Sequence, residues 1–287
     1  MTAALRDETA AVLVAFHPDT ALAEHARAAL HHACRLVVVD NTPGPAAPVL
    51  DAVAALDGAE LIRLGDNAGL ASALNVGVER LSPAPPAWVL LLDQDTALRE
   101  GFSAAVAGAC ADPGAGIVGV NFVNSRTGRA MYPETGGPVA VPFVITSGSL
   151  VRWPCLLATG PFAADYFVDA IDVEYGLRAR ACGWAVVRVP GVGMDHGMGN
   201  VTVNRVLGYA RATSEYSPLR HYYMARNVVA TALRHGWRER AWLVETLVSR
   251  AKFVALTLVM ERGRVAKLRA IVRGTLHGLA GRMGPAR

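Results

Sequence analysis

The feature that most limits the fold of this chain is a regular alternation of apolar runs and helix-like segments in its N-terminal part. Strand-like runs cover 10–16, 36–41, 60–64 and 88–95, and helical segments cover 22–30, 49–56 and 70–80. Short apolar runs bounded by turn residues are typical of buried strands. Their alternation with helices predicts an α/β fold with a doubly wound, mostly parallel sheet.

Charge divides the chain unevenly. The 287 residues carry a net charge of +4, but residues 234–287 hold 12 basic and 3 acidic residues, a net +9. Residues 1–233 are therefore net acidic, at −5. We divide the chain into a domain at 1–233 and a basic helical extension at 234–287.

The basic extension has apolar residues at helical spacing. In Trp242–Met260 they are Val244, Leu247, Val248, Ala251, Val254, Ala255 and Leu258, and an Arg-rich helix is expected over Val265–Leu279. Such segments form either a helical hairpin that packs on the domain or a helix pair that lies on an anionic membrane surface. No uncharged apolar run reaches the ~18 residues that span a bilayer.

Composition and cysteine usage limit the class of protein. Hydrophobic residues make up 52% and charged residues 18%, which allows a large core and excludes a disordered chain. The four cysteines show no C-x-x-C spacing, and the N-terminus has no secretion-signal pattern. We expect a reduced, cytoplasmic protein.

Two carboxylates follow the strand at 88–92. Asp93 and Asp95 are two residues apart, so their side chains share a face if the strand geometry continues. Ligands of open α/β sheets bind at the carboxyl ends of the strands, and hard cations such as Mg²⁺ prefer carboxylate oxygens. The alternative is a turn cap beside a solvated acid.

The common phosphate-binding fingerprints are absent from the sequence. Neither G-x-G-x-x-G after the first strand nor G-x-x-x-x-G-K-[ST] occurs. A metal held by Asp93 and Asp95, assisted by arginine, is the expected replacement for neutralising a diphosphate.

A second acidic segment follows Phe167. If the helix begins here, Asp169 and Asp172 share a face and Glu174 pairs with Arg178. The alternative is a set of acids that favour a helix N-terminus, with one surface ion pair. Further along, His196 stands among glycines and by itself is a weak metal-ligand candidate.

Seven ordered blocks between about residues 10 and 230 resemble the family 2 inverting glycosyltransferases, and most closely the bacterial rhamnosyltransferase branch. The blocks are Ala15–Asp19, Val39–Asn41, Asp66–Gly69 with Ala73 and Asn75, Leu92–Asp95, Thr146–Ser149, Phe167–Glu174, and Ser217–Tyr223 with Arg226 and Asn227. Two positions depart from the usual pattern. Ala15-Phe16 stands where Thr-Tyr is frequent, and Thr42-Pro43 stands where Gly-Ser is usual, which affects details of base recognition.

The resemblance implies a GT-A-like fold and a role for each matching residue. Asp95 would be the principal ligand of Mg²⁺ or Mn²⁺, with Asp93 beside the ribose and metal and His196 as a second ligand. Asp172 would be the general base, with Asp169 and Glu174 as alternatives. The donor-binding residues would be Phe16, Asp40, Asn41, Asn67, Gly69, Asn75 and Asp93, together with Arg220, Tyr223 and Arg226, which would face the donor diphosphate or the acceptor.

The implied reaction is metal-dependent, inverting transfer of L-rhamnose from dTDP-L-rhamnose to a hydroxyl of a surface polysaccharide or lipid-linked glycan. The alternatives are a UDP-sugar donor, such as galactosyl or galactofuranosyl, and a non-catalytic sugar-nucleotide-binding protein. The expected partners are the donor and the glycan acceptor, with no nucleic acid. Peripheral contact of residues 234–287 with the cytosolic face of the inner membrane, and a homo-oligomer, are left open.

Overall fold

The computed structural model of the chain describes residues 2–125, 128–197, 202–206, 209–213 and 215–286. It separates into two compact units, 1–167 with 171–197, and 168–170 with 198–287. The division predicted after residue 233 falls in the last turn of a helix of the second unit, and residue 287 of the predicted extension lies outside the described residues.

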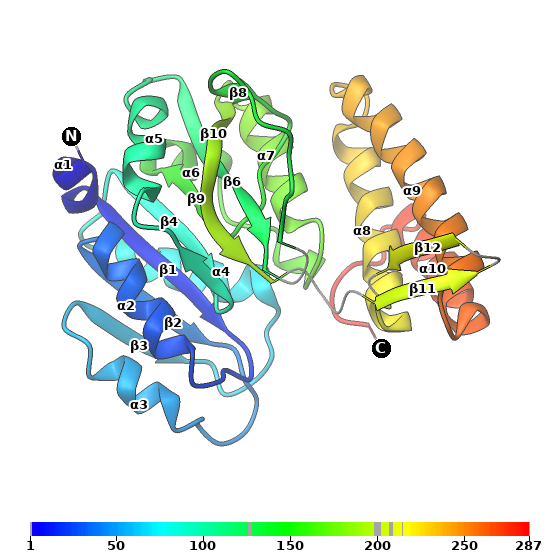
Figure 1. Ribbon diagram of the computed structural model, residues 1–287, viewed down its shortest axis with the longest axis horizontal. Helices are drawn as coiled ribbons and strands as arrows, with labels where there is room; N and C mark the ends of the chain where they lie inside the picture. Colours follow the sequence, from blue (N-terminus) through cyan, green and yellow to red (C-terminus); the bar gives the residue numbers. More distant parts are fainter. Residues whose placement is uncertain (1, 126–127, 198–201, 207–208, 214, 287) are drawn as a thin grey trace. The chain divides into compact units, whose positions relative to one another are not determined.

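The first unit begins with the predicted alternation. Strands β1 (Thr9–Ala15), β2 (Arg35–Asp40), β3 (Ala59–Arg63) and β4 (Trp88–Asp93) alternate with helices α2 (Leu22–His32), α3 (Val49–Ala54) and α4 (Leu70–Leu81). A short helix, α1 (Thr2–Asp7), precedes them. The strands pair in parallel in the order β3-β2-β1-β4. Because the direction of winding reverses between β1 and β4, right-handed crossovers put α2 and α3 on one face and α4 on the other (Figure 1).

The remaining elements complete a mixed sheet. They are β5 (Thr96–Leu98), α5 (Phe102–Cys110), β6 (Ala115–Asn124), β7 (Arg129–Ala130), β8 (Val139–Ala140), β9 (Ser149–Arg152), α6 (Trp153–Thr159), the 3-10 turn η1 (Ala164–Tyr166), α7 (Ile171–Ala181) and β10 (Ala185–His196). The sheet continues from β4 through β9, β6 and β10 to β5. The β6–β10 pair is parallel, whereas β9 and β5 pair antiparallel with their neighbours.

The core of this unit is the sheet itself. All seven residues of β1 and the first five of β4 are buried, because helices cover both faces and leave no polar side of the strand. The mostly parallel, doubly wound α/β fold predicted from the sequence is therefore confirmed.

Two local predictions were wrong. Strand structure was expected over 141–151 with an interruption at Thr146–Ser149, but the strands there are β8, which ends at Ala140, and β9, which begins at Ser149. The helix expected to include Asp169 starts at Ile171 instead, because Asp169 and Ala170 have left-handed backbone angles (φ +63° and +58°). Asp169 and Asp172 therefore do not share a helix face.

The described residues of the second unit form a hairpin and three helices. Its elements are β11 (Thr202–Val206), β12 (Tyr209–Thr213), α8 (Pro218–His235), α9 (Arg240–Met260) and α10 (Arg264–Leu279). Helix α8 begins with Pro218 at its first position and Ser217 as N-cap, whose hydroxyl accepts the Arg220 backbone N–H. The two helices predicted in the extension are thus present.

Glycines set the close packing of α10 on α8. A Cβ on Gly278 would lie 2.6 Å from the carbonyl oxygen of Arg226, and one on Gly274 would meet the carbonyl of Tyr222. Only glycine lets the two backbones approach so closely. None of the described helices is both long and apolar enough to cross a bilayer.

Candidate functional site

The carboxyl ends of β1 and β4 define the switch point of the sheet. The two strands are parallel neighbours, and the strand order reverses between them. Ligands of open α/β sheets bind in the crevice at such a point. The chain leaves β1 at Phe16 and leaves β4 into Asp93-Gln94-Asp95, so the paired carboxylates lie where the fold favours a ligand.

The side chain of Gln94 hydrogen-bonds the segment after β4 to the segment after β1. Its side-chain carbonyl accepts the Phe16 backbone N–H at 2.7 Å, and its amide donates to the Phe16 carbonyl at 2.9 Å. Its own carbonyl oxygen lies 2.7 Å from Nδ1 of His25. The sequence predicted roles for the two acids but not for this middle residue, whose contacts fix the turn that carries them.

His196 reaches the carboxylates through strand register. At the end of β10, His196 is paired with Thr96 of the antiparallel strand β5 and with Asn124 of the parallel strand β6. This pairing places the imidazole beside Asp95, which directly precedes Thr96. His196 Nδ1 lies 3.3 Å from an Asp95 carboxylate oxygen, and Nε2 lies 3.9 Å from Asp93.

Asp93, Asp95 and His196 form a three-ligand cluster. One donor atom from each residue lies within 4.8 Å of the others. The side chain of Asp95 is 49% exposed and that of His196 12%, so the cluster is open on the carboxylate side and enclosed on the imidazole side. Two carboxylates and one imidazole suit Mn²⁺ or Mg²⁺, which retain positions for water and phosphate oxygens. The donor set therefore fits the predicted metal.

Thr96 and Ser147 form hydrogen bonds that hold His196 and Asp93 in position. The Thr96 hydroxyl lies 3.1 Å from His196 Nδ1 and contacts the Ser147 hydroxyl. Ser147 Oγ also accepts the Asp93 backbone N–H at 2.9 Å. Both supporting residues are buried. Ser147 was included in one of the seven matching blocks without a role for it, and Thr96 was missed.

The pKa of His196 reflects this setting. Burial lowers the pKa, but the carboxylates of Asp95 and Asp93 raise it by more, so the pKa lies above its ordinary value of 6.5. In the metal-free protein, Asp93 and Asp95 stabilise the protonated imidazole of His196. With a metal bound, the same two carboxylates and the neutral imidazole would all be ligands of the ion.

Asp40 lies fully buried at the end of β2. One of its carboxylate oxygens is 3.1 Å from Arg63 Nε, and the other accepts the Thr42 backbone N–H at 3.1 Å. Thr42 Oγ1 in turn accepts the His17 backbone N–H at 2.8 Å. Asp40 thereby ties together the segments that follow β1 and β2, beside the switch point.

Asn41 and Asn67 shape the loop before α4. The Asn41 amide donates to Asn67 Oδ1 at 3.2 Å, and its carbonyl accepts the Ala68 N–H at 2.8 Å. Gly69 has φ +86°, and a Cβ there would lie 2.7 Å from the Phe167 ring. This position requires glycine for both reasons.

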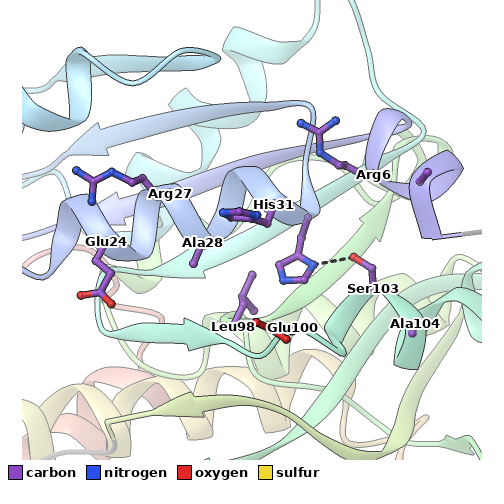
Figure 2. A pocket seen from close by; sticks show the side chains of 11 residues that line it. Arg6, Glu24, Arg27, Ala28, His31, Leu98, Glu100, Ser103 and Ala104 are labelled. Carbon is purple, nitrogen blue, oxygen red and sulfur yellow. Dashed lines mark hydrogen bonds between the residues drawn. The ribbon is translucent and has the colours of Figure 1, made fainter.

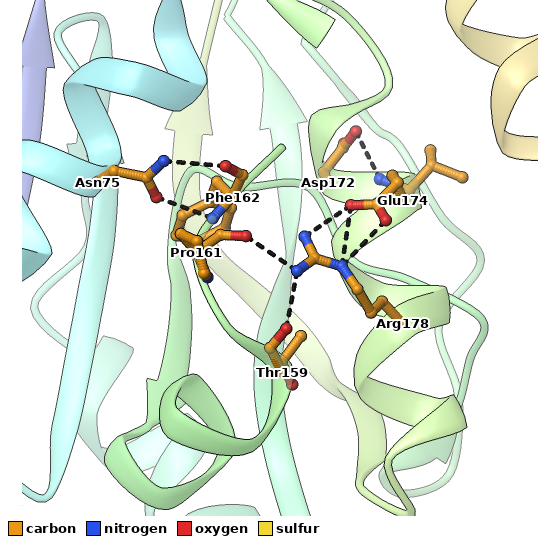
Figure 3. Close-up of polar contacts among 8 residues, drawn as sticks. Asn75, Thr159, Pro161, Phe162, Asp172, Glu174 and Arg178 are labelled. Atoms are coloured by element: carbon orange, nitrogen blue, oxygen red, sulfur yellow. Dashed lines mark hydrogen bonds and ion pairs between the residues drawn. The ribbon is translucent and has the colours of Figure 1, made fainter. Parts of the chain in front are cut away.

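Asn75 and Glu174 have structural contacts rather than free side chains (Figure 3). Asn75 makes two hydrogen bonds to the backbone of Phe162, at 2.9 and 2.8 Å. The buried Glu174 forms the predicted pair with Arg178, at 2.8 Å, and Arg178 also donates to the carbonyls of Thr159 and Pro161. These contacts join α4, α6 and α7.

Asp172 lies in the first turn of α7 and is half-buried. Its carboxylate accepts the Val173 N–H at 2.9 Å, and the side chain lines a small cavity that also includes Thr146 and Tyr175. The negative charge of Asp172 also contributes, after burial, to a raised pKa of Tyr132. Of the three predicted base candidates, Asp172 and Glu174 belong to the first compact unit and Asp169 to the second.

Asp169 is held by residues of α8 in the second unit. One of its oxygens is 3.2 Å from the Arg220 guanidinium, and the Asn227 amide donates to the carbonyls of Val168 and Asp169. Burial raises the pKa of Asp169 above its ordinary value and outweighs Arg220, which lowers it.

The three α8 residues predicted to face donor or acceptor differ in exposure. The side chain of Arg220 is 45% exposed, whereas Tyr223 and Arg226 are buried. Arg226 donates to Asn227 Oδ1 and to the Gly284 carbonyl, and the Tyr223 hydroxyl accepts the Ala286 N–H. The C-terminal residues thus cover Tyr223 and Arg226 within this unit.

Comparison with known proteins assigns this arrangement to a family. Residues 20–154 match the profile described as "Glycosyl transferase family 2". The chain is also 25% identical over 270 residues to the dTDP-rhamnosyl transferase RfbF of Shigella flexneri, with 88% of this chain and 89% of that protein covered. The matched segment and the relative together support a glycosyltransferase of family 2.

Solved structures agree on the fold of this glycosyltransferase. S. aureus TarS 1-349 in complex with UDP-GlcNAc has a TM-score of 0.59 at 12% identity, covering 97% of this chain and 93% of that one. The mannosyltransferase PcManGT of Pyrobaculum calidifontis, in complex with GDP-Man and Mn²⁺, has a TM-score of 0.58 at 16% identity, covering 96% and 87%. The chain spans only 47% and 43% of two longer structures. The predicted GT-A fold is therefore confirmed.

The glycosyltransferase also has a cavity of ≈ 680 Å³, whose lining residues Figure 2 shows. Residues of α1, α2 and α5, together with Leu98 and Glu100, line it, and none of Asp93, Asp95 and His196 does. Its wall includes Arg6, Arg27 and a hydrogen bond of 2.8 Å between His32 and Ser103. The size of a cavity therefore does not locate the metal-ligand cluster in this fold.

Proposed function

We propose that this glycosyltransferase transfers L-rhamnose from dTDP-L-rhamnose, with inversion and with a divalent metal, to a hydroxyl of a surface polysaccharide or lipid-linked glycan. The observation that carries the proposal is the convergence of Asp93, Asp95 and His196 at the switch point of the sheet. The rhamnosyl donor is taken from the similarity to RfbF, whose name includes dTDP-rhamnosyl transfer.

In this proposal Asp95, Asp93 and His196 hold Mg²⁺ or Mn²⁺. When bound, the ion would neutralise the diphosphate of the donor and the charge on the leaving group. Phe16, Asp40, Asn41, Asn67 and Gly69 would form the nucleotide-binding edge. Because Asn75 makes both of its side-chain hydrogen bonds to Phe162, we assign it a positioning role in that edge.

Asp172 is the proposed general base. Its carboxylate takes the proton of the acceptor hydroxyl as that oxygen bonds to the anomeric carbon, and the bond from this carbon to the diphosphate oxygen breaks with its electron pair on the diphosphate. Glu174 is less suited to this role because Arg178 holds its buried carboxylate. Asp169 is less suited because the guanidinium of Arg220 already pairs with it.

Arg220 keeps its predicted role as a contact of the donor or the acceptor, since its side chain is partly exposed. Tyr223 and Arg226 are proposed to position α8 rather than to touch substrate, because both are buried against C-terminal residues. The predicted peripheral contact of residues 234–287 with the cytosolic face of the inner membrane would bring the enzyme to a lipid-linked acceptor.

Calorimetric titration with dTDP, UDP, dTDP-L-rhamnose and UDP-galactose, each with Mn²⁺ or with EDTA, tests the donor and the metal together. We expect tight binding of the dTDP compounds that EDTA removes. Preference for uridine compounds would support the alternative UDP-sugar donor. Absence of metal-dependent binding would contradict the proposed metal site.

Substitutions separate binding from chemistry. Asp95→Asn should weaken Mn²⁺-dependent donor binding, whereas the matched control Asp51→Asn, on the exposed surface of α3, should not. Asp172→Asn should keep donor binding and lose turnover by about 100-fold or more, the range of a general base. Near-normal turnover of Asp172→Asn would move the base to Asp169 or Glu174, and a non-catalytic protein would show binding without turnover in every variant.

A further inference from the structure

Exposed apolar side chains gather in the second compact unit. Among the described residues, 16 large hydrophobic side chains are exposed, and 12 of these lie between Leu233 and Leu279. Scattered exposed apolar residues are ordinary, but a contiguous set marks an interaction surface. The exposed apolar residues between Leu233 and Leu279 therefore indicate an interaction surface.

Helix α10 carries the most regular of these sets. Five exposed residues recur at spacings of three or four, which places them on one side of a helix. We call this set the α10 stripe; it comprises Val265, Leu268, Val272, Leu276 and Leu279, which are 40–63% exposed. An open depression of ≈ 390 Å³ runs along it, lined by Leu268, Val272 and Leu276 together with the neighbouring polar residues of α10.

The opposite side of α10 is already occupied. Its buried residues are Lys267, Gly274 and Gly278, and the two glycines lie against the backbone of α8. These positions are about half a helical turn away from the stripe. The stripe is therefore not an unused part of the packing between α8 and α10 but a second face of the helix.

Only positive charge borders the stripe. Arg264 and Arg269 flank it on its two sides, and Arg273 follows farther round the helix. Residues 262–287 contain no Asp or Glu. The preceding acid, Glu261, is buried and contacts Lys267 Nζ at 2.6 Å, so it does not offset the exposed arginines.

We infer that the α10 stripe is a docking surface for an anionic phospholipid membrane. Leucine and valine would enter the boundary between headgroups and acyl chains, and the bordering arginines would contact lipid phosphates. Helix α9 adds apolar exposure, since Val244, Leu247 and Val248 are 62%, 57% and 49% exposed. The inference rests on the membrane contact in the proposed function and names the face that makes it.

A second copy of the chain fits this face less well. Pairing two α10 stripes would bring the arginines of one copy against those of the other, with no exposed acid in 262–287 to receive them. Like charges at short range oppose association. An anionic bilayer supplies both the apolar layer and the negative charge.

Flotation of the full chain with vesicles tests the inference independently of transferase activity. We expect recovery with vesicles of equal phosphatidylglycerol and phosphatidylcholine, little recovery with phosphatidylcholine alone, and a loss as NaCl rises from about 0.1 to about 0.5 M. The double variant Leu268→Gln/Leu276→Gln should lower recovery by about tenfold or more, since each leucine contributes buried apolar area.

Matched controls keep the result interpretable. Leu157→Gln changes a 70% exposed leucine on α6 of the other unit and should leave flotation unchanged. Arg264→Gln/Arg269→Gln should weaken binding to anionic vesicles, whereas Arg27→Gln on α2 should not. Equal recovery of the leucine double variant and the parent chain would overturn the inference. So would a dimer, measured by sedimentation, that this variant abolishes while the parent chain fails to float. Normal donor titrations in the same variants would show that a failure here leaves the transferase proposal intact.

Discussion

Thr96 and His196, 100 residues apart in the sequence, are paired across β5 and β10, with Thr96 Oγ1 3.1 Å from His196 Nδ1. The same hydroxyl contacts Ser147, which also holds the backbone of Asp93. One buried hydroxyl network thus links both ends of the candidate metal cluster. Groups that orient metal ligands in this way commonly change metal affinity by 10–100-fold when removed.

Replacing Thr96 with valine should therefore weaken Mn²⁺ binding by about tenfold without loss of the fold, because shape is kept and only the hydroxyl is lost. Calorimetric titration with Mn²⁺ measures the effect. Thr96→Ser, which keeps the hydroxyl, should restore most of the affinity. Unchanged affinity in Thr96→Val would mean that His196 needs no support from β5.

The parts of the fold that sequence predicted correctly depend on local pattern. Strands β1 to β4 and helices α2 to α4 follow from apolar runs and turn residues that lie next to each other in the chain. The pair of Glu174 and Arg178 follows from helical spacing alone. Each of these needs no knowledge of distant residues.

The parts that sequence could not predict depend on register or on strained backbone. His196 reaches Asp95 only because β10 pairs with β5 in one register, which the run of glycines around it does not specify. The helical assignment of Asp169 failed because its φ is +63°, a left-handed conformation that is uncommon for residues other than glycine. The role of Gln94 depends on a contact with Phe16, 78 residues away.

The raised pKa of His196 predicts two pH effects of opposite sign. A folded-state pKa above 6.5 means that protonation stabilises the metal-free protein below pH 6.5, and this contribution is lost as pH rises through the folded pKa. Mn²⁺ needs the neutral imidazole, so Mn²⁺ affinity should fall as pH drops through the same range.

Thermal unfolding of the metal-free protein and Mn²⁺ titration, each measured between about pH 5.5 and 8.5, test these effects. In His196→Gln, both pH dependences should flatten over that range. If the variant keeps the parent pH dependence of Mn²⁺ affinity, another group controls the metal site.

The contacts of Glu174 predict a loss of stability rather than of chemistry. The Glu174 side chain is 4% exposed and forms an ion pair with Arg178. Arg178 also donates hydrogen bonds to the carbonyls of Thr159 and Pro161 at the end of α6. Glu174→Gln should lower the free energy of unfolding by about 3 kcal/mol, the usual cost of breaking a buried pair. Urea unfolding measures this, and Asp172→Asn, at a half-buried position where the amide oxygen can still accept the Val173 N–H, should differ from the parent by less than about 1 kcal/mol. Equal stability of the two variants would contradict the assigned roles.

The contact of Gly278 with α8 predicts a glycine that cannot be enlarged. A Cβ at this position would lie 2.6 Å from the Arg226 carbonyl oxygen and 2.9 Å from the Val229 side chain, and neither the α8 backbone nor a half-buried β-branched residue moves easily. Gly278→Ala should therefore destabilise the protein by about 1–3 kcal/mol in urea unfolding, despite the higher helix propensity of alanine. Gly108 of α5 is the matched control, because open space surrounds its Cβ position. Gly108→Ala should stabilise by about 0.5–1 kcal/mol. A gain in both variants would mean that α10 is not packed on α8 as closely as the glycine contacts require.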